Sequence, residues 1–119
     1  MSTYELEHHE PDESGVDVVA LAGELDLTNA SGLEQRLETE VPSDAALVVD
    51  LNRVVFIDSA ALHCLFRLAR ARGSSRLALV VEPMAPIARA VEIVDLGQAV
   101  TVAPTLEAAR AALIGAQTT

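Results

Sequence analysis

The sequence predicts an α/β fold: a single domain in which a mixed, mostly parallel sheet follows an N-terminal hairpin and carries about four helices. Two observations support this prediction. Aliphatic runs of strand length alternate along the chain with segments whose apolar residues recur at helical spacing. The 119 residues are enough for one hydrophobic core but not for two. We therefore expect residues 1–119 to form one domain, with residues 1–3 and 115–119 frayed.

The N-terminal part of the chain predicts a hairpin followed by a helix. The first two strand candidates are separated only by a short segment that contains Pro and Gly, which is typical of a turn. The helix is indicated by apolar residues on one face and charged residues on the other. The expected elements are, in order, an edge strand over 4–9, a turn over 11–15, a strand over 16–22 and a helix from Thr28 or Asn29 to the residue before Pro42.

The middle of the chain predicts two strands and a long helix. Residues 45–51 are too continuously aliphatic for a half-exposed strand and indicate a central one. The polar pair Asn52-Arg53 is expected to interrupt this strand. Residues 54–57 are β-branched or aromatic and predict a short buried strand. Helical spacing then begins at Ala60 and ends at Gly73, a residue suited to the left-handed conformation that closes many helices.

The rest of the chain repeats the alternation of strand and helix. Proline and glycine mark the boundaries of these elements. The expected elements are a buried strand over 77–81, a helix opened by Pro86 and closed by residues 95–97, a short strand over 99–103 and a last helix opened by Pro104 and Thr105.

Asp58 and Ser59 mark the junction between the 54–57 strand and the long helix. Their side-chain oxygens can accept backbone N–H groups, and such a pair before a helix most commonly acts as a cap. The junction also places a hydroxyl where the N–H groups and the dipole of a helix favour negative charge. Ser59 is therefore either a capping residue or a serine that accepts a phosphoryl group. Asp26, which also follows a strand and precedes a helix, is either a cap or an acid at the same end of the sheet as Ser59.

A helical wheel at about 100° per residue separates two sides of the long helix. One broad arc is apolar and should face the core. Ser59, His63, Arg67 and Arg70 fall together outside this arc, with Phe66 at its edge. Aromatic and Arg side chains are favoured at protein interfaces, so this side is a candidate partner surface. The alternative is that Phe66 packs at the margin of the core and the arginines complement the helix C-terminus.

Composition and charge limit the classes of function. The net charge of −10 argues against direct nucleic-acid binding, which needs a basic surface. No apolar run approaches the length that spans a bilayer, and the N-terminus lacks the features of a signal peptide, so we expect no membrane insertion. The one cysteine, Cys64, excludes an internal disulfide, and we expect a cytoplasmic protein.

Arginines are concentrated in and after the long helix. Residues 59–76 contain no acidic residue, and their arginines form either a basic strip for an acidic partner or a solvated helix face. These arginines are Arg67, Arg70, Arg72 and Arg76.

Motifs for catalysis and cofactor binding are missing from the sequence. It contains neither of the glycine-rich loops that bind nucleotides, and Ser59 lacks the glycines of a hydrolase nucleophile turn. A phosphoaspartyl receiver domain with Asp50 as acceptor would require a lysine, and the chain has none. His8 and His9 are adjacent in a strand and point to opposite faces, which argues against a metal site. We expect no catalytic residues, metal or cofactor.

Several segments in register resemble one family. Residues 48–51 followed by 54–62, the segment 23–26, and the segments 86–89 and 96–97 resemble the anti-sigma factor antagonist branch of the STAS domain family. The resemblance covers nearly the whole chain. It implies a STAS-like fold and a partner-switching protein whose unmodified form binds an anti-sigma factor that is also a serine kinase, thereby freeing a sigma factor.

The resemblance also implies how this binding is regulated. The kinase phosphorylates the serine directly after the aspartate, here Ser59, which weakens the complex, and a metal-dependent serine/threonine phosphatase restores it. Asp26 and Asp58 match the two acids that flank this serine. The chain departs from the family pattern at Ala60-Ala61, where the family often has Ser-Gly. An alternative within the same fold is an accessory STAS subunit that docks constitutively on a transporter ATPase or a signalling scaffold.

Overall fold

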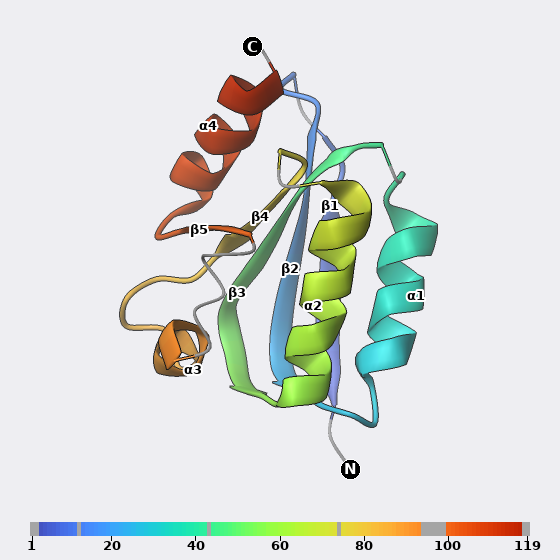
Figure 1. Ribbon diagram of the computed structural model, residues 1–119, viewed down its shortest axis with the longest axis vertical. Coiled ribbons are helices and arrows are strands. Elements are labelled where there is room, and N and C mark those ends of the chain that lie inside the picture. Colours follow the sequence, from blue (N-terminus) through green and yellow to red (C-terminus); the bar gives the residue numbers. More distant parts are fainter. Residues whose placement is uncertain (1–2, 12, 43, 74, 94–99, 118–119) are drawn as a thin grey trace.

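The computed structural model describes residues 3–11, 13–42, 44–73, 75–93 and 100–117. Within these residues the chain forms five strands and four helices, arranged as two helical layers on a central sheet (Figure 1). The elements are β1 (Tyr4–His9), β2 (Val16–Leu25), α1 (Ala30–Glu40), β3 (Ala46–Ile57), α2 (Ser59–Arg72), β4 (Leu77–Val80), α3 (Ala88–Ile93), β5 (Thr101–Ala103) and α4 (Leu106–Gln117).

The sheet has the predicted mixed topology. Its strand order is β1-β2-β3-β4-β5. β1 pairs antiparallel with β2 as a hairpin, and the other neighbouring pairs are parallel. The expected α/β fold with an N-terminal hairpin, a mostly parallel sheet and four helices is therefore confirmed.

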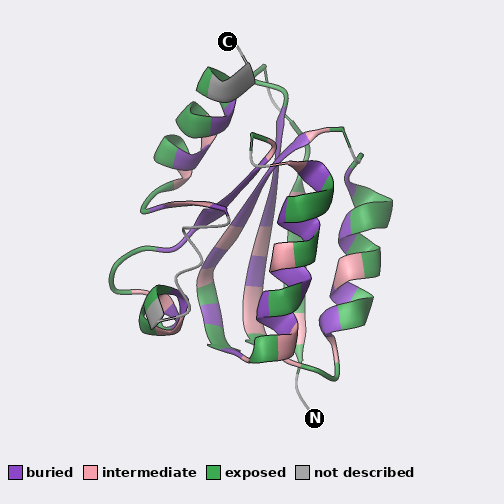
Figure 2. Cartoon of the chain, viewed as in Figure 1, coloured by how far each residue is buried: buried purple, intermediate pink, exposed green. Residues whose placement is uncertain are grey.

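The two faces of the sheet carry separate hydrophobic clusters. Alternate residues of a strand point to opposite faces, so Val49 of β3 belongs to one cluster and Val48 to the other. The larger cluster packs the sheet against α1, α2 and α3. The smaller one packs it against Ala109 and Leu113 of α4. Figure 2 shows the buried residues along the strands and on the sides of the helices that face the sheet.

β3 corrects the prediction that Asn52-Arg53 interrupts a strand. The strand is continuous over 12 residues, because two register shifts against β2 absorb the extra residues. Ala20 pairs with Asp50 whereas Ala22 pairs with Arg53, and a second shift follows between Gly23 and Glu24. Bulges of this kind bend a strand and re-aim its side chains without ending the pairing.

The bulges also correct the prediction that residues 54–57 form a short buried strand. Val54 and Ile57 are buried in the larger cluster, but Val55 is 60% exposed and Phe56 is 49% exposed. The pattern of two exposed residues between two buried ones is not that of a regular strand, in which alternate residues share a face.

Several boundaries differ from those expected. α1 begins at Ala30, after a turn over 27–29, and α3 begins at Ala88, two residues after Pro86. Residues 115–117 were expected to be frayed but belong to α4. The expected fraying of residues 1–2 and 118–119, the helix end at 95–97 and the strand residue 99 lie outside the described residues. In the described part of the chain, every helix is too short or too polar to cross a membrane.

Candidate functional site

The C-terminal ends of β2 and β3 lie side by side at one end of the sheet. Leu25 and Ile57 are the last paired residues of the two strands. The loop 26–29 follows β2, and Asp58 with α2 follows β3, so these two connections meet at the lower end of the molecule in Figure 1. The sequence left open whether Asp26 is a cap or an acid at the same end of the sheet as Ser59, and the parallel pairing of β2 with β3 places Asp26, Asp58 and Ser59 at one end.

Asp58 makes hydrogen bonds to both connections at this end of the sheet. Its side-chain Oδ1 accepts a hydrogen bond from the backbone N–H of Ala61 at 3.0 Å, which makes it the N-cap of α2. Its Oδ2 accepts from the N–H of Leu27 at 3.0 Å. Its own N–H donates to the carbonyl of Leu25 at 3.1 Å. One residue therefore starts α2 and also fixes the position of the neighbouring loop.

Asp26 makes hydrogen bonds within the loop 26–29. Its N–H donates to Asn29 Oδ1 at 2.9 Å, and its Oδ1 accepts from the N–H of Thr28 at 3.0 Å. Asn29 in turn donates from Nδ2 to the carbonyl of Glu24 at 2.9 Å. The carboxylate thus has a structural role before α1, in addition to its place beside the start of α2.

Ser59 is the first residue of α2 and is exposed. Because Asp58 supplies the N-cap, the hydroxyl of Ser59 is not the capping group. The first turn of a helix is also where the helix dipole favours negative charge. The side chain is therefore accessible, and it lies in a backbone environment that tolerates an added anion.

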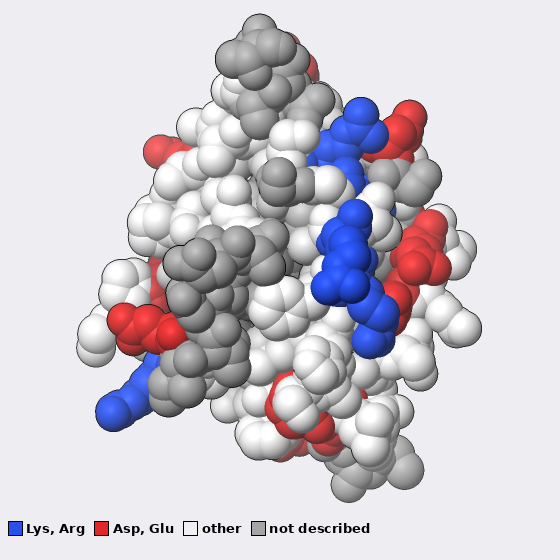
Figure 3. All heavy atoms as spheres, viewed as in Figure 1, with Lys and Arg blue, Asp and Glu red and all other residues white. Residues whose placement is uncertain are grey.

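The four other predicted partner residues lie along α2 but are not equivalent. His63 and Arg70 are exposed. Phe66 is half-buried and packs against the larger hydrophobic cluster, as the alternative interpretation expected. Arg67 is exposed but is held by α1. Figure 3 shows basic side chains in a column over α2, beside acidic side chains on α1.

Arg67 makes a close ion pair with Glu34 of α1. Its Nη2 lies 2.8 Å from Glu34 Oε1, and its Nε lies 3.2 and 3.3 Å from the two carboxylate oxygens. The hydrogen bond from Arg67 holds the pKa of the Glu34 carboxyl below its usual value. A partner that recruits Arg67 must therefore compete with Glu34.

Arg72 does not belong to a basic surface strip. It is only 7% exposed, and its guanidinium donates to the carbonyls of Val41, Pro42 and Ala45 at 2.9–3.1 Å. These carbonyls follow the end of α1, so Arg72 joins the C-terminal ends of α1 and α2. Burial lowers the pKa of this guanidinium. The predicted strip is thus reduced to Arg67 and Arg70 on α2 and the half-buried Arg76 beyond it.

Three exposed apolar side chains at this end of the sheet were not singled out from the sequence. They are Leu27, Val55 and Phe56, exposed by 76, 60 and 49%. Leu27 carried no signal, because it alternates with polar residues in the same way as Leu25, which is buried. Val55 and Phe56 carried none, because their sequence is that of a buried strand and their exposure follows from the bulge.

Cys64 and His8 also carry side chains that can act in catalysis, but neither contributes to this site. Burial, with the Glu34 carboxylate as a smaller cause, raises the pKa of the Cys64 thiol to about 11. His8 lies 2.8 Å from the buried carboxylate of Asp17. Among the described residues, no group of three or more His, Cys, Asp or Glu side chains is placed to hold a metal ion.

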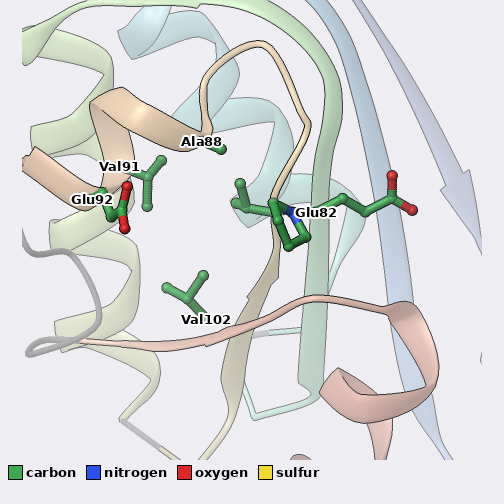
Figure 4. A pocket seen from close by; sticks show the side chains of 7 residues that line it. Glu82, Ala88, Val91, Glu92 and Val102 are labelled. Atoms are coloured by element: carbon green, nitrogen blue, oxygen red, sulfur yellow. The ribbon is translucent and has the colours of Figure 1, made fainter.

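A cavity of about 390 Å³ lies between the end of β4 and α3 (Figure 4). Its lining is mainly apolar, and none of the residues predicted for the site contributes to it. The side chain of Glu82 points away from the other labelled residues. The lining residues are Val81, Glu82, Pro83, Ala88, Val91, Glu92 and Val102.

Comparison with known families identifies the class of this domain. The chain belongs to the STAS domain family, because the family model described as "Mlab, STAS domain" matches residues 8–107. This confirms the resemblance that the sequence segments indicated.

Individual relatives are anti-sigma factor antagonists. Over 65 residues the chain is 37% identical to the anti-sigma-F factor antagonist RsfB of Mycobacterium tuberculosis (strain CDC 1551 / Oshkosh), covering 54% of the chain and 53% of RsfB. The chain thus spans about half the length of the curated relatives it matches. The crystal structure of an anti-sigma factor antagonist from Mycobacterium paratuberculosis is similar with a TM-score of 0.78 and 28% identity, covering 93% of this chain and 94% of that one.

A more distant structure shares the fold alone. The Bacillus cell fate determinant SpoIIAA in its phosphorylated form matches with a TM-score of 0.57 and 21% identity, covering 90% of this chain and 96% of that one. SpoIIAA is also known in an unphosphorylated form.

Proposed function

We propose that the chain is an anti-sigma factor antagonist regulated by phosphorylation of Ser59. The observation that carries the proposal is an exposed serine in the first turn of α2, held in place by Asp58, in a chain similar to RsfB. In the unphosphorylated state the chain binds an anti-sigma factor that is also a serine kinase, and a sigma factor is released. The chain is then a cytoplasmic binding protein and a substrate of the kinase, not an enzyme.

The chemistry of a phosphate at Ser59 explains how such a complex would dissociate. A phosphate adds about −1.5 to −2 charges and three acceptor oxygens. The start of α2 can accommodate that charge in the free protein, although the carboxylates of Asp58 and Asp26 oppose it. Inside an interface shaped for a hydroxyl, an unpaired phosphate loses its water and costs roughly several kcal/mol, which weakens binding by orders of magnitude.

Removal of the phosphate would reset the cycle. A metal-dependent serine/threonine phosphatase requires an accessible phosphoserine, and the exposure of Ser59 supports this assignment. SpoIIAA, which has the same fold, is known both with and without phosphate. Of the two alanines after Ser59, the partly exposed Ala60 adds only a methyl group beside the hydroxyl, whereas Ala61 is buried under α2.

The proposal is tested with purified anti-sigma factor kinases encoded in the same genome. We expect ATP-dependent phosphorylation of the wild-type chain, located at Ser59 by mass spectrometry and lost in Ser59→Ala. We expect Ser59→Asp to weaken binding to the kinase at least about 100-fold in calorimetry.

Ser75→Asp is the matched control, since it adds the same charge at an exposed residue beyond the other end of α2 and should bind like the wild type. Equal affinity of the phosphorylated and unphosphorylated chains for the kinase would refute the switch. A complex with a transporter ATPase and no modification of Ser59 would instead support the accessory-subunit alternative.

A further inference from the structure

α4 covers only part of the side of the sheet on which it packs. In β2 and β3, the smaller hydrophobic cluster ends at Val18 and Val48, near the start of each strand. Figure 1 shows α4 beside the end of the sheet that is far from the start of α2. Among the described residues, the later parts of β2 and β3 therefore have no helix on this side, although their other side packs in the larger cluster.

The pleat of the strands identifies the side chains at the far end of this uncovered area. Leu25 and Ile57 pair with each other and belong to the larger cluster. Their neighbours Glu24 and Phe56 also pair, and the alternation along both strands points them to the opposite side, which is the side of α4. Val55, the extra residue of the bulge, is exposed beside Phe56.

A hollow of about 320 Å³ continues this area toward β1. Ala20 and Ala22 of β2 line it, and the small size of these side chains leaves the sheet concave between its neighbouring strands. β1 pairs Glu7 with Ala20 and Glu5 with Ala22, and β3 pairs Arg53 with Ala22. The uncovered area is called the open face, and it consists of Glu5, Glu7, Ala20, Ala22, Glu24, Arg53, Val55 and Phe56.

The shape of the open face fits a helix. Sheets of parallel strands commonly carry helices on both sides, and β2 and β3 are parallel. α4 already packs Ala109 and Leu113 on the same side of the sheet, so the open face continues a surface that accepts a helix. The hollow over the alanines can take one large apolar side chain, and Phe56 offers a second apolar contact one strand away.

The charges of the open face select the kind of helix. Glu5, Glu7 and Glu24 are exposed, and Arg53 is the single cation among these four residues. Opposite charge steers association and suppresses wrong partners. A complementary helix therefore carries an apolar stripe flanked by Lys or Arg side chains.

A second copy of this chain does not supply such a helix. It would bring a further net charge of −10 to an acidic surface. Arg67 and Arg70 are the exposed cations of α2, and Arg67 is paired with Glu34. In the part of the chain that the structure describes, Ile114 is the one large exposed apolar side chain on a helix, which is too little for an apolar stripe.

We propose that the open face binds a basic amphipathic helix of another protein. The apolar stripe of this helix covers Ala20, Ala22 and Phe56, and its cations face the glutamates of β1 and β2. The inference goes beyond the proposed function and does not depend on it, because α1 and α2 pack on the other side of the sheet. A helix on the open face and a partner on α2 can therefore be bound at the same time.

The test uses a synthetic helical peptide of about 18 residues made of Leu and Lys, with Leu on one side. A peptide with Glu in place of Lys is the probe control. We expect the Lys peptide to produce the largest amide chemical-shift changes at residues 20–24 and 53–56, and the Glu peptide not to bind. We expect Phe56→Ala and Glu5→Lys each to weaken binding of the Lys peptide at least about five-fold.

Matched variants separate the open face from general attraction to an acidic protein. Glu13→Lys makes the same change of charge as Glu5→Lys, at an exposed residue between β1 and β2. Met84→Ala removes an exposed apolar side chain elsewhere, in the segment after β4. We expect both controls, and Ser59→Asp, to bind the Lys peptide within about two-fold of the wild type. Thermal unfolding checks that all variants fold alike.

Several outcomes would overturn the proposal. They are no binding of the Lys peptide at about 1 mM, equal effects of Glu5→Lys and Glu13→Lys, or the largest shift changes in α2. A wild-type dimer that Phe56→Ala converts to a monomer would assign the open face to a second copy instead. Each of these results leaves the proposed function standing if Ser59→Asp still loses the kinase, and a chain that binds the peptide but no kinase would overturn only the proposed function.

Discussion

At the scale of single residues, the start of α2 combines a structural role with the proposed functional one. The alternatives for Ser59 were capping and phosphorylation, and the structure assigns the cap to Asp58. Asp58 takes the cap, which leaves the Ser59 hydroxyl free of that role and exposed. The second oxygen of Asp58 accepts from the N–H of Leu27, so the same carboxylate caps α2 and holds the loop 26–29 in place.

Replacement of Asp58 should reveal this double role. Asp58→Ala removes the N-cap of α2 and the tether to the loop 26–29, so we expect a loss of about 2 kcal/mol in the free energy of unfolding measured in urea. Asp58→Asn retains one acceptor oxygen, and Asn caps helices as well as Asp, so we expect it to lose about half as much. Equal stability of Asp58→Ala and the wild type would show that these hydrogen bonds do not hold the site.

The sequence predicted only those features of the candidate site that depend on residues close together in the chain. The helix start at Asp58-Ser59 and the exposure of His63 follow from neighbours along the chain, and both were correctly placed. The pairing of Arg67 with Glu34 joins residues 33 positions apart, and no sequence period reports it. The same holds for Arg72, whose burial depends on carbonyls after α1. Partners in α1 or in the segment just after it determine which arginines remain available to another molecule.

At the scale of elements, β3 shows why the strands were predicted more successfully than their side-chain directions. The aliphatic composition of residues 45–51 and 54–57 predicted strand in both segments. The polar pair between them suggested a break, because a bulge and a strand end carry the same local signal. The pairing with β2, which the sequence alone does not specify, preserved the strand and exposed Val55 and Phe56.

Gly23 lies in β2 at the second of these two register shifts. Its φ of +100° lies in the region that favours glycine, and a Cβ there would lie 2.6 Å from the carbonyl oxygen of Thr3. The N–H of the next residue, Glu24, donates to that same oxygen at 2.9 Å. Gly23 therefore lets the end of β2 approach the segment before β1 closely enough to form this bond.

Substitution of Gly23 should consequently loosen the hairpin. We expect Gly23→Ala to lower the free energy of unfolding by about 1–3 kcal/mol and to weaken hydrogen-exchange protection of the Glu24 amide. Gly32→Ala is the matched control, since a Cβ at that position in α1 meets no atom within 4 Å. It should stabilise the protein by about 0.5–1 kcal/mol because alanine favours helix. Similar effects of the two substitutions would contradict the close approach at Gly23.

At the scale of the whole molecule, the site is supported by two helices, α1 and α2, that are joined to each other. α1 and α2 begin at the same end of the sheet, pack on the same hydrophobic cluster and are joined at their far ends by Arg72. The Arg67–Glu34 pair joins them midway. A charge added at Ser59 therefore acts on a surface whose supporting elements are connected along their length, so the proposed switch needs a change at the surface rather than a rearrangement of the fold.

Cys64 offers a direct test of that rigidity. It is fully buried, with Sγ 3.6 Å from the carbonyl of Ala30, so a reagent reaches it only when α1 and α2 separate. Its thiol has a pKa of about 11, so only about one thiol in a thousand is ionised at pH 8 in the folded state. We expect thiol labelling at pH 8 to be slow in the native protein, rapid in guanidinium chloride, and equally slow in wild type and Ser59→Asp. Faster labelling of Ser59→Asp would mean that the added charge opens the helix pair, and loss of partner binding would then follow from a conformational change instead of from the cost of burying charge at the interface.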